Sequence, residues 1–137
     1  MSSDAEVVIV GAGVAGSAMA IVLARLGFAV LLLEKSSVHV DRIRGESITP
    51  WGVEEAQRLE LLEILLKVGG HFASRLVLYG EGVSPEAARA TAVDLATLVP
   101  NVPGTLKIGH PPICQALNNA AVVAGVTLIR GIDKIMF

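Results

Sequence analysis

Cysteine and aromatic residues are both scarce in this chain, and each shortage excludes a class of protein. The single cysteine, Cys114, cannot form an internal disulfide, which excludes a small secreted domain held together by disulfides. Only 4 % of the residues are aromatic, and no basic surface interleaved with aromatic residues is present, so we expect no nucleic-acid partner. A lone cysteine also fits a reducing compartment, and we expect a cytoplasmic location.

Charge is nearly absent from one long stretch near the N-terminus. Between Glu6 and Glu34 the only charged residue is Arg25, and by hydropathy alone this stretch resembles a membrane span. Glycines interrupt the stretch, however, and Asp4 and Glu6 stand where a signal peptide carries positive charge. Two buried strands flanking one helix explain the same hydrophobicity, so the sequence predicts neither a transmembrane nor a targeting segment.

Aliphatic residues, in contrast, are abundant. Hydrophobic residues make up 53 % of the 137 positions, which suits a parallel sheet covered by helices. The length suits one domain, residues 1–137, without a second. The apolar runs predict buried strands at Val7–Val10, 29–33 and 126–129, and helices over 14–26 and 111–124. The sequence therefore predicts an α/β fold built on a Rossmann-like strand–helix–strand unit.

The middle of the chain is more polar and less regular. Residues 35–49 are predicted to form a surface loop. Pro50 is predicted to begin an amphipathic helix that Gly69 and Gly70 end. Residues 71–79 are predicted to form a half-exposed strand, and the stretch VDLATLVP to hold another short strand. This region is interpreted as strands inserted into the α/β unit.

Three glycines, Gly11, Gly13 and Gly16, follow the first predicted strand and open the first predicted helix. A G-x-G-x-x-G pattern in this position is typical of a dinucleotide-binding turn. The first glycine makes the turn tight, the second leaves the backbone bare where a pyrophosphate approaches, and the third lets helix and strand pack closely. The N–H groups that begin the helix, including those of Val14 and Ala15, are expected to face the anion.

An acidic residue, Glu34, closes the second predicted strand. Its carboxylate can accept hydrogen bonds from both ribose hydroxyls of an adenosine and repels a 2′-phosphate, so NADP is disfavoured here. The next residue, Lys35, is a further candidate for the cofactor site. The pattern does not separate NAD from FAD. An alternative also stays open, in which the glycines serve packing only and Glu34 is a solvated strand end.

The stretch DRIRGESITPWGVEEAQRLELLEIL, which follows the acid, favours FAD. Together with the glycine pattern it resembles the N-terminal part of the flavin-dependent monooxygenases of the aromatic hydroxylase superfamily. That superfamily also includes flavin-dependent halogenases and geranylgeranyl-reductase-like enzymes. The resemblance implies FAD as cofactor and a glutathione-reductase-type FAD domain, here incomplete and with an inserted strand region.

The resemblance also assigns further cofactor-binding candidates. In the family an arginine of the loop after the acid reaches the FAD pyrophosphate or ribose, and Arg44 matches it best, with Arg42 as second choice. A later arginine of the family, at the start of the helix before the third strand, is replaced here by His110. A further departure is Glu60, which stands where the family usually has glycine.

The resemblance implies an enzyme that uses NAD(P)H and O₂ to hydroxylate a small organic substrate, with FAD carrying out the oxygen chemistry. Family members are longer than this chain, and their later Asp-Gly and Gly-Asp segments have no counterpart in it. We therefore expect the chain to form the adenosine half of an FAD site and to be catalytically incomplete alone. Its apolar sheet edge is expected to be uncovered and to permit self-association.

No catalytic acid, base or nucleophile is assigned. Glu46, His39, His71 and Asp94 are candidates by residue type only, and a surface role is expected for each, whereas Cys114 is expected in the core. No cluster with metal-ligand spacing is recognised. Three other functions stay open: a halogenase or geranylgeranyl-reductase-like fragment, a truncated non-catalytic dinucleotide-binding module, and a fragment of an NAD-dependent dehydrogenase.

Overall fold

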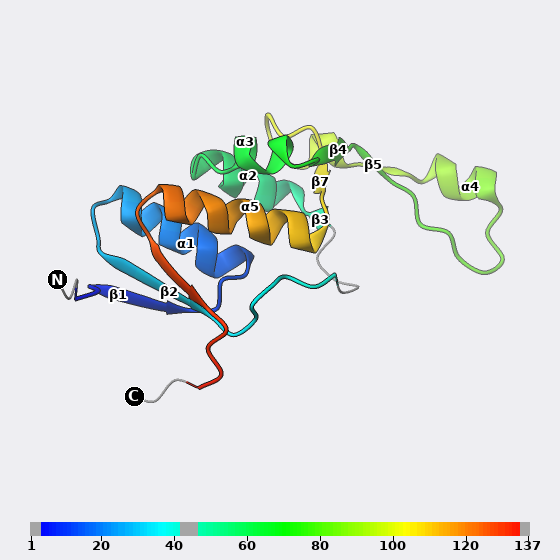
Figure 1. Ribbon diagram of the computed structural model, residues 1–137. Coiled ribbons are helices and arrows are strands. Elements are labelled where there is room, and N and C mark those ends of the chain that lie inside the picture. The colour runs from blue at the N-terminus through cyan, green and yellow to red at the C-terminus, as the bar shows by residue number, and fades with distance from the viewer. Residues whose placement is uncertain (1–3, 42–46, 135–137) are drawn as a thin grey trace.

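The main sheet is parallel and three-stranded. The structure, a computed structural model, describes residues 4–41 and 47–134. The sheet has the order β1-β2-β8, with β1 at Val7–Val10, β2 at Val30–Glu34 and β8 at Thr127–Arg130. Helices α1 (Val14–Arg25) and α5 (His110–Val123) pack against each other and lie on the same side of this sheet (Figure 1). The predicted α/β fold with a strand–helix–strand unit is confirmed.

The core lies between this sheet and the two helices. Ile21 of α1, Leu32 of β2 and Leu117 of α5 are fully buried there, because apolar residues recur on one face of each element. The opposite face of the sheet keeps large apolar side chains in contact with solvent, among them Val8 and Val10 of β1. Within the described residues the helices therefore cover one face of the sheet only.

The prediction of one helix between Pro50 and the Gly69-Gly70 pair is wrong in one respect, because the segment forms two helices. Helix α2 covers Pro50–Arg58 and α3 covers Leu62–Lys67. Between them Glu60 adopts a left-handed backbone conformation, with φ of 57°, which turns the chain and places Leu61 in the core. The amphipathic pattern runs through the break, so it gave no sign of the turn.

The middle of the chain forms two small antiparallel sheets. One has the order β3-β7-β4, from Ser47–Ile48, Thr105–Lys107 and His71–Ala73. The other pairs β5 (Arg75–Leu76) with β6 (Val93–Asp94), and between these two strands helix α4 (Pro85–Ala90) extends away from the rest of the molecule (Figure 1). A short 3₁₀ helix, Leu95–Thr97, follows β6.

Two predictions for this region need correction. The expected loop over residues 35–49 ends in a strand, β3, because Ser47 and Ile48 pair with β7. The expected strand over residues 71–79 is two short strands, β4 and β5, which pair with different partners. Both differences arise from pairing between strands far apart in the chain.

None of the helices in residues 4–41 and 47–134 has the length and apolar character that a membrane span needs.

Candidate cofactor site

The glycine turn follows β1 and gives each glycine a different surrounding. Gly11 has a φ of 103°, a conformation that favours glycine. A Cβ on Gly16 would lie 2.0 Å from the carbonyl oxygen of Gly11, so α1 can approach β1 only because this residue has no side chain. A Cβ on Gly13 would meet no atom within 4 Å, and the space in front of this residue is open. Packing therefore requires glycine at position 16, whereas no contact within the described residues requires glycine at position 13.

The N-terminus of α1 lies at this open space. Gly13 is the N-cap residue and supplies no side-chain cap, and the first turn contains no acidic residue. Val14 and Ala15, which begin the helix, are exposed. The first N–H groups of a helix lack intrahelical partners and carry the positive end of the helix dipole. The arrangement suits an anion such as a pyrophosphate.

Glu34, at the carboxyl end of β2, reaches back to the glycine turn. Its Oε2 accepts a hydrogen bond from the Ala12 N–H at 2.7 Å, and its Oε1 accepts one from the Ser36 N–H at 2.8 Å. Burial is the largest single influence and raises the pKa of this carboxyl, but the bonds from Ser36 and Ala12 outweigh it and bring the pKa below its ordinary value. The group is therefore an anion at neutral pH, and each oxygen keeps further lone pairs for a ligand.

A cavity of about 220 Å³ lies between the glycine turn and the end of β2. Gly13, Glu34, His39 and His110 line it, so it brings together candidates from the glycine turn, from β2 and from α5. Lys35 follows Glu34 and is exposed. Arg42, Arg44 and Glu46 lie outside the described residues.

His110 begins α5, and its Nε2 lies 3.6 Å from Sγ of Cys114 one turn later. Cys114 is fully buried, as predicted for a core residue. Burial first, and then the negative charge of Glu34, raise the pKa of its thiol, which stays protonated at neutral pH. His110 therefore lies next to an uncharged sulfur and also lines the cavity.

His71 and Asp94 lie in the small sheets and do not line this cavity. His71 is exposed, and Asp94 accepts a hydrogen bond from the Ala96 N–H, which begins the 3₁₀ helix. Both positions fit the predicted surface roles. His39, in contrast, is half-buried and lines the cavity, and its role stays a prediction.

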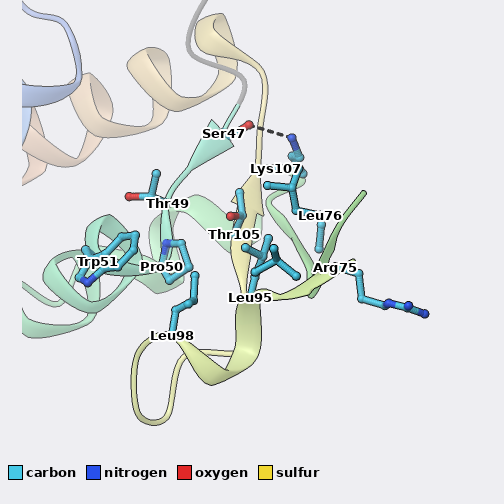
Figure 2. A pocket seen from close by; sticks show the side chains of 12 residues that line it. Ser47, Thr49, Pro50, Trp51, Arg75, Leu76, Leu95, Leu98, Thr105 and Lys107 are labelled. Carbon is cyan, nitrogen blue, oxygen red and sulfur yellow. Dashed lines mark hydrogen bonds between the residues drawn. The ribbon is translucent and has the colours of Figure 1, made fainter. Parts of the chain in front are cut away.

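A larger cavity, of about 430 Å³, lies on the small sheets (Figure 2). Trp51, Leu76 and Leu98 line it, and Lys107 at its edge donates a hydrogen bond to Ser47 Oγ at 2.8 Å. It contains neither the glycine turn nor Glu34. Most of its exposed lining is apolar, although Arg75 and Lys107 also belong to it, and it holds none of the cofactor-site candidates named from the sequence.

The sequence analysis missed a group of polar side chains behind the glycine turn. Asn118 of α5 and Ser17 of α1 are both buried, and both bond to the carbonyl oxygen of Ala12. Arg130, at the end of β8, donates a hydrogen bond to Oδ1 of Asn118 and lies 3.1 Å from Nε2 of His39. One signal was present in the sequence: Asn118 stands next to Leu117 and three residues before Ala121, on the apolar face of its helix.

Comparisons with known proteins agree with a dinucleotide-binding fold. A family model described as "FAD binding domain" matches residues 4–125. Squalene epoxidase erg1 of Aspergillus fumigatus is 44 % identical over 77 residues, which cover 53 % of this chain and 16 % of that protein. Squalene monooxygenase of Rattus norvegicus is 36 % identical over 77 residues, 56 % of this chain and 13 % of that protein. The chain thus spans less than a fifth of the length of these relatives.

Solved structures of flavoproteins share the fold. p-Nitrophenol 4-monooxygenase PnpA from Pseudomonas putida superposes with a TM-score of 0.76 at 21 % identity, over 91 % of this chain and 31 % of that one. A flavoprotein/dehydrogenase from Cytophaga hutchinsonii gives a TM-score of 0.77 at 20 % identity, over 96 % of this chain and 32 % of that one. The family match spans the glycine turn, Glu34 and His110. The chain belongs to the FAD-binding domain family, and its cofactor is FAD.

Proposed function

We propose that the chain forms the adenosine diphosphate-binding part of an FAD-dependent monooxygenase, with residues 1–137 acting as one partial domain. The observation that carries the proposal is the open space at Gly13, which lies beside the ionised carboxylate of Glu34 in one cavity. A bare backbone at a helix N-terminus suits a pyrophosphate, and a carboxylate at the next strand end suits a ribose.

The proposed binding mode follows from the chemistry of these groups. The backbone of the glycine turn, Gly11 to Gly16, receives the pyrophosphate. The Ala15 N–H donates to its oxygens, and the Val14 N–H does so in place of its contact with the Cys114 sulfur. Glu34 accepts hydrogen bonds from the ribose while still holding the Ala12 N–H.

Positive charge near the pyrophosphate comes from a second group of residues. The candidates are Lys35, Arg42 and Arg44, since arginine can form paired hydrogen bonds with phosphate oxygens. His110 also lines the cavity.

The reaction of the whole enzyme is proposed from its relatives. Bound FAD supplies the oxygen chemistry, with NAD(P)H as the source of electrons. The curated relatives are named squalene epoxidase and squalene monooxygenase, which favours oxygenation of an apolar organic substrate, by epoxidation or hydroxylation, over halogenation or reduction. We also propose that the isolated chain self-associates through its uncovered sheet. The cytoplasmic location stays a prediction.

Gly13→Ala tests the cofactor site. The new Cβ meets no protein atom, so we expect the variant to fold like the wild type, but the methyl group occupies the space of the pyrophosphate. We expect FAD to bind at least tenfold more weakly, which corresponds to a loss of about 1.4 kcal/mol in binding free energy. Calorimetry and flavin fluorescence measure the affinity. Gly80→Ala is the matched control, since a Cβ there is equally free of contacts. Unchanged FAD affinity in Gly13→Ala would contradict the proposed site, and tighter binding of NAD than of FAD would favour a dehydrogenase fragment.

A further inference from the structure

Asn118 uses every hydrogen-bonding group of its side chain inside the core. Its Nδ2 donates to the carbonyl oxygen of Ala12 at 2.9 Å and to Ser17 Oγ at 2.7 Å, and its Oδ1 accepts from Arg130. Ser17 in turn donates to the same carbonyl oxygen at 3.1 Å. A buried amide costs free energy unless it is bonded in this way, and an apolar side chain would fill the same position without the network. The network therefore has a purpose other than filling the core.

The shared target of the network is one backbone atom in the glycine turn. The peptide between Ala12 and Gly13 is trans, so the Ala12 carbonyl and the Gly13 N–H point in opposite directions. Asn118 and Ser17 hold the carbonyl toward the core, and this directs the Gly13 N–H away from it. Gly13 lines the open cavity. The side chain of Asn118 thus sets the orientation of an N–H group at the cofactor site, although Asn118 does not line that cavity.

A second set of contacts fixes Asn118 itself. Arg130 is paired in register with Glu34, so its guanidinium lies at the same end of the sheet as the cofactor site. Its Nη2 contacts both Asn118 and His39, and its Nη1 is buried with no partner among the described residues. A buried nitrogen without a partner is unfavourable, which indicates that the position of this guanidinium is constrained by its neighbours. Asn118 therefore joins the glycine turn to the end of β8.

We propose that Asn118 is a positioning residue for the cofactor, which orients the Gly13 N–H toward the pyrophosphate through the Ala12 carbonyl. This inference rests on the proposed function, because it requires a diphosphate at the glycine turn. It assigns Asn118 no contact with the cofactor. The effect of Asn118 on binding is specific for ligands that contain the diphosphate, since adenosine alone does not reach the Gly13 N–H.

Asn118→Leu tests the inference, because leucine fills the volume but donates no hydrogen bond. ADP, FAD and adenosine are titrated into the whole chain, and the ¹⁵N–¹H signal of Gly13 is followed by NMR. We expect ADP and FAD to bind about tenfold more weakly, adenosine to bind within twofold of wild type, and the ADP-induced shift of the Gly13 signal to shrink. A purely structural role would weaken all three ligands alike. Asn119→Leu, on the exposed side of the same helix, is the matched control.

Ser17→Ala keeps the inference testable if Asn118→Leu does not fold. This variant removes one of the two donors to the Ala12 carbonyl, so we expect a smaller loss of ADP affinity and a smaller Gly13 shift in the same direction. Wild-type affinity for ADP and an unchanged Gly13 signal in the folded variants would overturn the inference and leave the proposed function intact. If the wild-type chain itself binds neither FAD nor ADP, the proposed function fails and the inference falls with it.

Discussion

At the scale of single residues, Glu34 combines a structural and a binding role. Its carboxylate accepts hydrogen bonds from the Ala12 and Ser36 N–H groups without a ligand, and the bond from Ala12 fixes the conformation of the glycine turn. Because both bonds favour the ionised form, its pKa lies below the ordinary value of a glutamate. A group with a lowered pKa in the folded state stabilises the fold above its unfolded pKa, and this contribution is lost as the pH falls through the folded pKa.

Glu34→Gln tests this role. An amide is a weaker acceptor than a carboxylate and does not titrate, so we expect a loss of about 1 kcal/mol in the free energy of unfolding at pH 7. The difference from wild type should narrow at an acidic pH below the lowered folded pKa of Glu34, where the wild-type carboxylate is protonated. Urea unfolding at both pH values measures this difference in the free energy of unfolding, with Glu81→Gln at an exposed position as the control. An equal difference in the free energy of unfolding at both pH values would contradict the assignment of the effect to the ionised carboxylate.

At the scale of elements, the turn between α2 and α3 carries a strained residue. Glu60 has a φ of 57°, and no hydrogen bond of its carboxylate to the described residues explains a left-handed glutamate. The related family usually has glycine at this position, and the structure supplies the reason, since only glycine adopts that conformation without a steric cost. The turn places Leu61 in the core, so the chain retains the conformation despite the side chain.

Glu60→Gly is therefore expected to stabilise the protein. Relief of the left-handed strain is worth about 1–2 kcal/mol, and the greater freedom of glycine in the unfolded chain offsets about 0.4–1 kcal/mol of it. We expect a net gain centred near about 0.8 kcal/mol in the free energy of unfolding, measured in urea. Asn101→Gly, at φ of 62°, is the comparison and should gain less, because asparagine tolerates this conformation. Equal or lower stability of Glu60→Gly would show that the turn is not strained.

At the scale of the whole molecule, the main sheet is covered on one face. Val8 and Val10 are 50 % and 60 % exposed, and β1 has one strand neighbour among the described residues. An apolar face next to an open strand edge favours association with another chain.

We expect the isolated chain to self-associate through this face. Sedimentation velocity should show larger species at higher protein concentration, and the double variant Val8→Lys, Val10→Lys should shift the chain toward the monomer. Val123→Lys is the control, since this exposed valine belongs to α5 and not to the sheet. Equal association of the double variant and the wild type would exclude the sheet as the contact.

Part of the cofactor site was predictable from the sequence. Gly13 and Glu34 were assigned from their spacing around one strand–helix–strand unit, and the structure brings them to one cavity with His110. The roles of Arg42 and Arg44 in cofactor binding stay predictions. Asn118 was missed because its partner, the Ala12 carbonyl, lies 106 residues away.

The sequence by itself determined the parallel α/β unit, the glycine turn and the acid at the end of β2. These features depend on apolar periodicity and on residues close in the chain, which local patterns express directly. Only the tertiary structure decided that β3 pairs with β7, that the helix after Pro50 breaks at Glu60, and that Asn118 meets Ala12. The reason is physical. The strand pairing and the Asn118 contact join segments far apart in the chain, and the local break at Glu60 is retained because it buries Leu61, so all three depend on how the whole core packs.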